Sequence, residues 1–222
     1  MQKNVPIITI IIPVLNQERF IGRCLRSILS QNFNRDEFEV IVVNDGSTDK
    51  TEFALSLFEE EIQIITNDSN EGLPASLNKA IRYVRSPFIV RVDADDFVSR
   101  DFLLFLHNFA MHNNYMDAIA CDYNIVDNRG EWISRKSCLD EPIACGILFR
   151  LDQIIDIGMY DENFLIHEER DLRIRFLKKY KIHRLELPLY RYRRHDTNIT
   201  NDVKSVKYHF TKLSEKHGDK LD

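Results

Sequence analysis

The sequence predicts an α/β fold in which a mostly parallel, doubly wound sheet is covered by helices. Its first half contains continuous apolar runs rich in β-branched residues, such as IITIIIPV at residues 7–14, which are typical of strands buried on both faces. Segments with apolar residues at i, i+3 and i+4, such as residues 17–31, separate these runs. Strand and helix alternate four times within about 110 residues, the pattern of a parallel sheet wrapped by helices.

The expected elements place three polar motifs at one edge of this sheet. The strands are expected at residues 7–14, 38–43, 62–66 and 87–92, and the helices at 17–31, 51–58 and 75–84. Polar stretches follow three of the strands, at residues 16–18, 44–49 and 93–96. Ligands of open α/β sheets bind outside the carboxyl ends of the strands, so we expect these three motifs to converge on one crevice.

The second half of the chain is less regular. Its expected elements are a helix at residues 101–112, a strand at 118–126, an apolar run at 143–149, a helix at 170–179 and a late strand at 188–193. A polar, lysine-containing tail follows from about residue 201. We therefore expect the regular sheet to be built mainly by the first half.

Composition indicates an ordinary globular protein. A length of 222 residues with 44% hydrophobic residues is enough to bury a sizeable core. The four cysteines are widely spaced, without a C-x-x-C pair, which argues against a disulfide framework and a zinc site and favours reduced thiols in a cytoplasm. The apolar run at residues 5–15 fits a buried strand better than a signal peptide, because it contains Pro6 and Pro13 and lacks a cleavage site. No apolar stretch approaches the roughly 20 residues that span a bilayer, so we expect only peripheral membrane contact, if any.

The charge distribution is uneven. Residues 170–194 contain seven Arg and three Lys against two acidic residues, a balance of +8, so the remainder of the chain carries −13 of the total of −5. Such a basic segment can face an anionic ligand, a phosphate group or an anionic membrane surface. A solvated helix face is the alternative.

The usual phosphate-binding loops of α/β proteins are missing. The chain contains neither G-x-x-x-x-G-K-[ST] nor a G-x-G-x-x-G after the first strand, which excludes a P-loop NTPase and a dinucleotide dehydrogenase. A phosphorylated ligand therefore needs another counter-charge, and a divalent cation held by carboxylates would supply it.

The stretch RVDADD at residues 91–96 offers such carboxylates. Asp93 and Asp95 are two residues apart on an extended segment and therefore point the same way. Clustered carboxylates repel one another, and we expect a bound Mg²⁺ or Mn²⁺ to relieve this repulsion. A D-x-D pair by itself is also common in exposed turns, so its surroundings decide.

Four motifs in order supply those surroundings. They are IITIIIPVLNQERFIGRCLRSILSQ, FEVIVVNDGSTDKT, NEGLPASLNKAI and SPFIVRVDADD. Their order and intervals resemble the inverting glycosyltransferases of family 2, over most of residues 5–110 and more loosely over 140–197. The resemblance implies a GT-A fold with a Rossmann-like sheet and a smaller acceptor-side region. It also implies a nucleotide-sugar-binding half at 1–110, an acceptor-binding half of the same domain at 111–200 and a C-terminal tail at 201–222.

The resemblance implies a nucleotide-binding role for several residues of the first three motifs. Pro13 and Glu18 match the turn that borders the nucleotide, and Asp45 matches the acid that faces the nucleobase. Asn78 matches an Asn on the helix before the metal motif, although Leu77 stands where the family often has Arg. For Asp45 the alternative is turn and helix-cap chemistry, for which Asp-Gly-Ser-Thr is well suited.

The same resemblance divides the acidic motif between nucleotide and metal. Asp93 matches the nucleotide-side acid and Asp95 the metal ligand, while Asp96 has no assigned role. His195, in LYRYRRHDTNIT, resembles a late motif that approaches the pyrophosphate or the metal, and we expect it as a second metal ligand beside Mn²⁺ or Mg²⁺.

The stretch FLIHEERDLRIRF resembles the acceptor-side segment that carries the catalytic base. Glu169 occupies the place of the base, where the usual residue is Asp, and the adjacent Glu168 is a competing candidate. Inverting transfer needs a carboxylate that takes the proton of the acceptor hydroxyl. The alternative for Glu169 is an ordinary i, i+4 ion pair with Arg173, like that of Asp171 with Arg175.

The function expected from these residues is a metal-dependent glycosyltransferase. It would move a sugar from a nucleoside diphosphate donor, with a UDP-sugar favoured, to an acceptor hydroxyl with inversion. The expected acceptor is a glycan or lipid-linked molecule of a bacterial surface polysaccharide, and no nucleic-acid partner is expected. Two alternatives stay open, a sugar nucleotidyltransferase and a non-catalytic nucleotide-sugar-binding domain.

Overall fold

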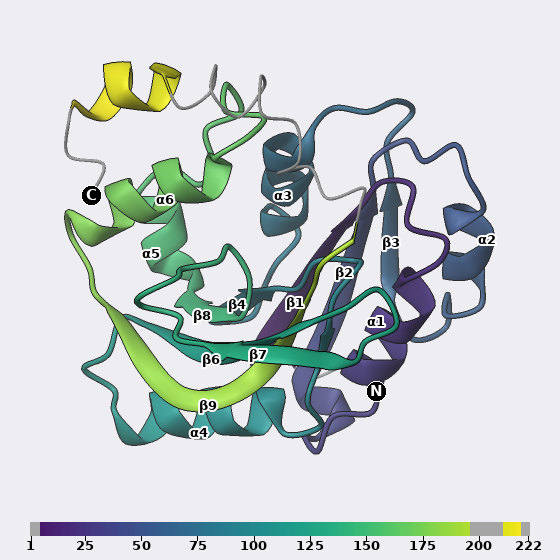
Figure 1. Cartoon of the computed structure of the whole chain (residues 1–222), viewed down its shortest axis with the longest axis horizontal. Coiled ribbons are helices and arrows are strands. Elements are labelled where there is room, and N and C mark those ends of the chain that lie inside the picture. Colours follow the sequence, from purple (N-terminus) through teal and green to yellow (C-terminus); the bar gives the residue numbers. More distant parts are fainter. Residues whose placement is uncertain (1–4, 196–210, 219–222) are drawn as a thin grey trace.

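A nine-stranded sheet with helices on both sides forms the protein (Figure 1). The structure is a computed structural model, and it describes residues 5–195 and 211–218. The strands are β1 (Ile8–Val14), β2 (Phe38–Asn44), β3 (Gln63–Thr66), β4 (Phe88–Arg91), β5 (Phe97–Val98), β6 (Ala118–Val126), β7 (Trp132–Lys136), β8 (Ile147–Arg150) and β9 (Ile182–Arg193). The helices are α1 (Ile21–Leu29), α2 (Thr51–Ser56), α3 (Leu73–Ile81), α4 (Phe102–His112), α5 (Leu151–Asp156) and α6 (Glu168–Leu177), with a short 3₁₀ turn at Arg35–Glu37.

The first half of the chain builds a parallel sheet. The strands β3, β2, β1 and β4 lie side by side in this order, and each neighbouring pair is parallel. Their apolar, β-branched sequences leave almost every residue of β1 and β2 buried, because helices cover both faces. The predicted fold class is confirmed, and each predicted element of this half is present within a few residues of its expected bounds.

The second half extends the same sheet with mixed strand directions. The antiparallel strand β8 joins β4 to β6, and β9 runs parallel to β6 and then pairs with the short β5. β9 is twelve residues long, whereas the sequence pattern predicted only its last six. The alternation that marks a strand is weak over residues 182–187, so only the pairing with β6 makes this part a strand.

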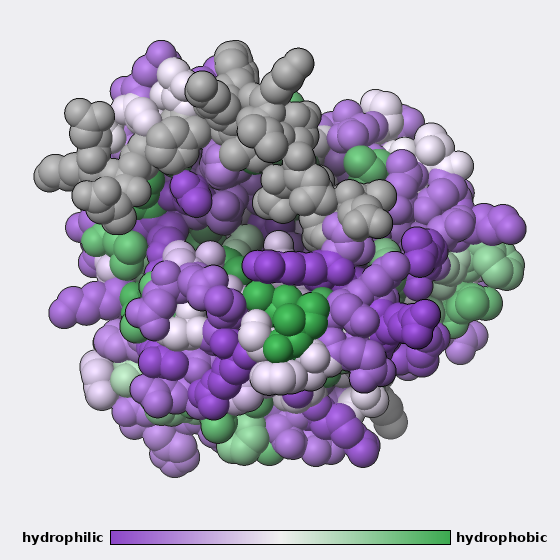
Figure 2. Space-filling model, in the orientation of Figure 1, coloured by the Kyte–Doolittle hydropathy of each residue, from purple (hydrophilic) through white to green (hydrophobic). Residues whose placement is uncertain are grey.

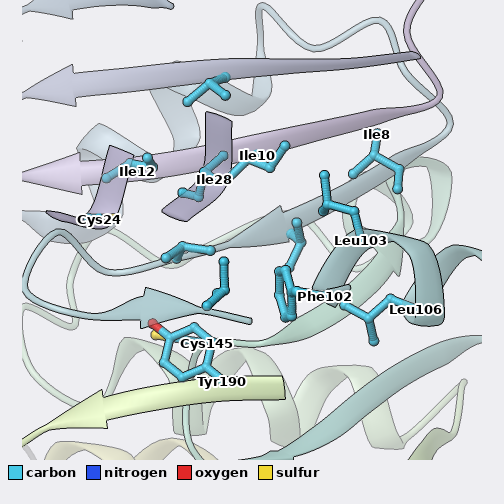
Figure 3. Close-up of a cluster of buried hydrophobic side chains, with 14 of the residues drawn as sticks. Ile8, Ile10, Ile12, Cys24, Ile28, Phe102, Leu103, Leu106, Cys145 and Tyr190 are labelled. Carbon is cyan, nitrogen blue, oxygen red and sulfur yellow. The ribbon is translucent and has the colours of Figure 1, made fainter. Parts of the chain in front are cut away.

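Two apolar cores lie on the two faces of the sheet. Ile8, Ile10 and Ile12 of β1 point to one face, where they pack near Ile28 of α1 and Phe102 of α4 (Figure 3). On the other face the core contains residues from β1, β2, α3, α5 and α6. Alternate residues of each strand serve opposite cores, as expected from the two-residue period of a strand.

The described part of the C-terminal tail is a helix at residues 211–217 that packs on the rest of the protein. Leu213 is fully buried, and Lys216 and His217 each contact the buried carboxylate of Asp171 on α6 at 2.6 and 2.8 Å. The rest of the predicted tail segment lies outside the described residues. The expected division near residues 110 and 200 stays a prediction.

The surface is largely polar in the view of Figure 2, with apolar groups gathered near the centre and over α2. Phe53 and Leu57 are each 67% exposed in the α2 region. Within the described residues, no helix combines the length and the apolar character needed to cross a membrane.

Candidate active site

The carboxyl ends of β1, β2 and β4 open into one cavity of about 470 Å³. All three polar motifs predicted to converge contribute to its lining, through Gln17, Asp45 and the acidic stretch from Asp93 to Asp96. The amino-terminal end of α6 lines the same cavity with Glu168 and Glu169. Of the residues predicted for the site, those that line this cavity are Pro13, Asp45, Asp93, Asp95 and Glu169.

The loops after β1 and β2 are tied to each other by side-chain caps. Asn16, which has a left-handed backbone with φ of 53°, accepts hydrogen bonds from the backbone N–H of Thr48 and Asp49. Glu18 is exposed, and its carboxylate accepts a hydrogen bond of 2.8 Å from the backbone N–H of Lys50. In this structure Glu18 therefore braces the second loop, and it is not among the residues lining the cavity.

Asp45 shapes the loop that follows β3. Its buried carboxylate accepts hydrogen bonds from the Asn67 side chain at 2.8 Å and from the backbone N–H of Glu71 and Gly72 at 2.8 and 2.9 Å. Gly72 has a φ of 95°, a conformation that strongly favours glycine. Asp45 thus holds the loop at residues 67–72 from a place in the cavity wall, whereas the turn at residues 44–47 is capped by Asn44, which accepts a hydrogen bond from the backbone N–H of Ser47.

Asn78 lies away from the cavity. It is buried on α3, where its amide nitrogen donates to the backbone oxygen of Tyr160 and to Glu162, both at 2.9 Å. Its amide oxygen accepts a hydrogen bond of 3.0 Å from the backbone N–H of Tyr160. Asn78 therefore fixes the segment that leads to α6.

Arg91 is the main site residue that the sequence reasoning missed. It is 9% exposed, and its guanidinium donates to both carboxylate oxygens of Asp93, at 2.7 and 3.2 Å. A third N–H donates to Glu168 at 3.0 Å. The repulsion expected at the acidic motif is thus partly relieved by Arg91 without a metal. The signal was available, because Arg91 and Asp93 are two residues apart and share one face of an extended segment.

Asp96 is bound into the fold. Its carboxylate accepts hydrogen bonds of 2.7 Å from the Tyr190 hydroxyl and from the backbone N–H of Arg193, both on β9. Burial and the neighbouring Asp95 and Asp93 raise its pKa well above the ordinary value. This residue therefore joins the acidic loop to β9.

Cys145 completes a group of three side chains whose oxygen and sulfur atoms lie within 4.8 Å of one another, together with Asp93 and Asp96. Its Sγ lies 2.8 Å from Asp93 Oδ2, and burial raises the pKa of the thiol well above its ordinary value. A protonated thiol is a poor ligand for Mg²⁺ or Mn²⁺, which prefer oxygen. With Arg91 already on Asp93, this group is a weak candidate for a metal site.

Asp95 and His195 form the better candidate. Asp95 Oδ2 lies 2.8 Å from His195 Nε2, and the His195 ring packs against Phe20 with 5.0 Å between the ring centroids. Burial and the nearby Asp93 raise the pKa of Asp95, although His195 opposes the effect. In the part of the chain that the structure describes, no Lys or Arg forms an ion pair with Asp95. One carboxylate oxygen and one imidazole nitrogen suit Mn²⁺ better than Mg²⁺, which favours oxygen alone.

The two glutamates at the start of α6 have different environments. The Glu168 side chain is 6% exposed, and burial raises its pKa to about 7 against the opposing charge of Arg91. The Glu169 side chain is 33% exposed, and His167 Nδ1 lies 4.0 Å from its Oε1. Burial acts to raise the pKa of Glu169, but the His167 ring and the charge of Arg91 lower it overall. Glu169 is therefore the ionised and more accessible carboxylate of the two.

The ion pairs considered as an alternative on α6 form at only one of the two positions. Asp171 and Arg175 pair at 2.7 Å, with Asp171 fully buried. Glu169 and Arg173 form no ion pair among the described residues. The simple structural explanation therefore holds for Asp171 and fails for Glu169.

The amino-acid sequence was also compared with models of known protein families. The description "Glycosyl transferase family 2" belongs to the model that matches residues 9–183. The chain belongs to this family, and the resemblance stated from the sequence motifs is confirmed.

Several relatives are bacterial. The poly(ribitol-phosphate) beta-glucosyltransferase of Bacillus spizizenii is 36% identical over 110 residues, which cover 48% of this chain and 17% of that protein. The poly(ribitol-phosphate) beta-N-acetylglucosaminyltransferase TarS of Staphylococcus aureus is 30% identical over 127 residues, 55% of this chain and 22% of that protein. The matched part thus spans less than a quarter of the length of either relative.

Solved structures show the same fold. TarS residues 1–349 from S. aureus, in complex with UDP-GlcNAc, match with a TM-score of 0.78 at 19% identity and cover 94% of this chain and 66% of that one. The mannosyltransferase PcManGT from Pyrobaculum calidifontis, in complex with GDP-Man and Mn²⁺, matches with a TM-score of 0.75 at 18% identity, over 96% and 65% of the chains. The expected GT-A fold is thereby confirmed.

The environment of Glu168 predicts a particular pH dependence of stability. Its pKa is about 7 in the folded protein against an ordinary 4.5, so the folded state holds a proton that the unfolded chain releases. This proton contributes at most about 3 kcal/mol to the free energy of unfolding. The contribution is fully present below pH 4.5 and is lost as the pH rises to about 7. Glu168→Gln should therefore lose less unfolding free energy than the wild type between pH 4.5 and 7.5 in urea titrations.

The control is Glu52→Gln on α2, an exposed position that should follow the wild-type curve. Equal losses of unfolding free energy in Glu168→Gln and in the wild type would contradict the assignment of a protonated Glu168 near neutral pH.

Proposed function

We propose that this protein transfers a sugar from a nucleoside diphosphate donor to an acceptor hydroxyl, with inversion and with the help of a divalent cation. The observation that carries the proposal is the cavity that brings together Asp95, paired with His195, and the accessible carboxylate of Glu169. A cation position and a base in one cavity are what a single displacement at the anomeric carbon requires. Two structural neighbours bound to nucleotide-sugars support this choice of donor.

On the donor side, the cavity wall offers Pro13, Asp45 and Asp93. Asp45 lies between the first two strand ends and the loop at residues 67–72, a position suited to the nucleobase. Arg91 holds the Asp93 carboxylate in one orientation, in which it would accept a hydrogen bond from a ribose hydroxyl. Glu18 would act by bracing the loop after β2, and Asn78 by holding the segment that leads to α6.

Asp95 and His195 would hold the cation, which we propose is Mn²⁺ or Mg²⁺. The bound cation would neutralise the diphosphate and stabilise it as a leaving group. The mixed oxygen and nitrogen donors favour Mn²⁺, and one structural neighbour was solved with Mn²⁺.

On the acceptor side, Glu169 would take the proton of the attacking hydroxyl. Its lowered pKa keeps it ionised at neutral pH, and a base must be unprotonated before the reaction. Glu168, buried and bound to Arg91, would hold the start of α6 in place. The relatives named as poly(ribitol-phosphate) glycosyltransferases support a role in bacterial surface polysaccharide synthesis. The structural neighbour in complex with UDP-GlcNAc supports a UDP-sugar as the donor.

The cation assignment predicts the behaviour of Asp95→Asn. This change removes the negative charge beside His195, so the Mn²⁺-dependent part of UDP affinity should fall at least tenfold, because hard cations depend on charged oxygen ligands. Isothermal titration of UDP with and without Mn²⁺ measures this effect without any need for turnover. Asp140→Asn, an exposed position, serves as the control and should leave both titrations unchanged. A wild-type metal effect in Asp95→Asn would refute the assignment.

The base assignment predicts the behaviour of Glu169→Gln. The rate of sugar transfer should fall by about 10²- to 10⁴-fold, the usual contribution of a general base, while UDP and Mn²⁺ binding stay intact. In the wild type, the acidic limb of the kcat profile should lie below pH 4.5, because the pKa of Glu169 is lowered. If the limb lies near pH 7 and disappears in Glu168→Gln, Glu168 is the base and the proposal for Glu169 is wrong.

A further inference from the structure

A second, smaller cavity lies beside the proposed base. It has a volume of about 60 Å³ and shares Glu169 and the segment 142–144 with the main cavity. Its other wall contains Arg170 and Arg173 of α6, which do not line the main cavity. The rest of the lining is mostly apolar, with Ile147 and Phe149 among its residues. Glu169 therefore lies in the wall of both cavities. Apart from Glu169, the charged residues that line the smaller cavity are the two cations Arg170 and Arg173.

The arginines near Glu169 divide into paired and unpaired ones. Arg91 is bound to Asp93 and Glu168, and Arg175 to Asp171. Arg173 is only partly exposed, yet within the described residues its guanidinium has neither a carboxylate partner nor a side-chain hydrogen bond. Arg170, one turn earlier on α6, is exposed and also has no ion pair in the described part of the chain.

An unpaired, partly buried guanidinium carries a free-energy cost. Burial lowers the pKa of Arg173, since the charged group loses hydration without a counter-ion to replace it. The neighbouring Glu169 could pair with it but does not, which leaves the carboxylate accessible and the guanidinium available. An anion bound in the small cavity would supply the missing counter-charge.

We propose that Arg173 and Arg170 form a subsite for a phosphate group of the acceptor, next to the hydroxyl that Glu169 deprotonates. Two guanidinium groups one turn apart match the several oxygens of a phosphate. The cavity has room for roughly a few non-hydrogen atoms, so the phosphate lies within one sugar or polyol unit of the attacking hydroxyl. The donor diphosphate is excluded as the occupant, because these arginines lie beyond Glu169 and away from Asp95.

This subsite rests on the proposed function, since it assigns the acceptor of the same reaction. It accounts for part of the basic segment at residues 170–194, in which three other arginines contact groups of the fold itself. Arg175 binds Asp171, Arg184 binds Asp122, and Arg193 donates to the backbone oxygens of Asp95 and Asn128.

The test uses ligand-detected NMR on the full chain with UDP and Mg²⁺ present, so that the donor side is filled. The probes are ribitol 5-phosphate and ribitol, which differ only in the phosphate, and inorganic phosphate alone. The wild type should bind ribitol 5-phosphate at least tenfold more tightly than ribitol. Arg173→Gln should remove at least fivefold of this affinity, Arg170→Gln should weaken it less, and neither should change the binding of ribitol.

Two further variants separate charge, geometry and folding. Arg173→Lys keeps the charge without the planar fork, so it should retain an intermediate affinity for ribitol 5-phosphate. Lys178→Gln, an exposed position on the same helical segment, should bind all probes like the wild type. Equal affinity of the wild type for the two ribitol probes, or unchanged binding of ribitol 5-phosphate by Arg173→Gln, would overturn the subsite.

The donor reaction is followed separately, as hydrolysis of a UDP-sugar. Intact hydrolysis together with equal binding of the two ribitol probes would refute only the phosphate subsite. Absent hydrolysis of every UDP-sugar tested, together with Arg173-dependent binding of inorganic phosphate, would refute the proposed transfer reaction and leave a phosphate site.

Discussion

The hydrogen bonds of the Arg91 guanidinium hold two sides of the cavity in position. Arg91 lies at the end of β4, almost fully buried, and it donates to Asp93 on the donor side and to Glu168 at the start of α6. Removing one member of such a buried network leaves the other charges without a partner, at a cost of several kcal/mol. The position of α6, and with it the direction of Glu169, is thereby coupled to the acidic loop that follows β4.

This coupling explains how three neighbouring aspartates can have three different roles. Asp93 is neutralised by Arg91, and Asp96 is bound by Tyr190 and by the backbone of Arg193. Within the described residues, His195 is the only side chain that forms an ion pair with Asp95. A carboxylate with little positive charge around it is the one that gains most from a bound cation. These contacts are the reason why we propose Asp95, of the three adjacent aspartates, as the metal ligand.

The same principle applies to the two glutamates of α6. Glu168 is buried against Arg91, and its raised pKa shows that burial outweighs the ion pair. Glu169 faces the cavity and keeps its charge, and within the described residues it forms no ion pair with the neighbouring Arg173. Consecutive residues on a helix point about 100° apart, so Glu168 reaches Arg91 in the buried wall of the cavity while Glu169 stays more accessible. Local geometry alone thus separates a positioning carboxylate from a candidate base.

The sequence predicts those parts of the fold that depend on residues close together in the chain, and it predicts poorly those that depend on distant residues. The parallel sheet follows from local patterns, since apolar strands and amphipathic helices carry their own periodicity. The second half depends on pairing between distant segments. The two-residue strand β5 forms where it pairs with the end of β9, and the first part of β9 forms where it pairs with β6. The short helix α5 and the strand β7, which forms a local hairpin with β6, were also missed, because each is only five or six residues long.

The site shows the same limit. The motifs that line the cavity, including Asp45, Asp93 and Asp95, lie at strand ends and could be found from spacing and family resemblance. The contacts of Arg91 with Glu168 and of Cys145 with Asp93 join residues that are 77 and 52 positions apart. No single-sequence pattern encodes such pairs, so the contact between Arg91 and Glu168 was missed. The contacts of Asp96 with Tyr190 and Arg193 also join distant residues, and the role of Asp96 stayed open.

The most direct test of the account is to locate the cation. Crystals grown with UDP and Mn²⁺ can be measured at the manganese absorption edge, where the anomalous signal marks the ion itself. We expect one peak in contact with Asp95 and His195, with Arg91 still bound to Asp93 and Glu168. A peak among Asp93, Asp96 and Cys145, with Arg91 displaced, would contradict the central claim that Arg91 leaves Asp95 as the metal-binding carboxylate.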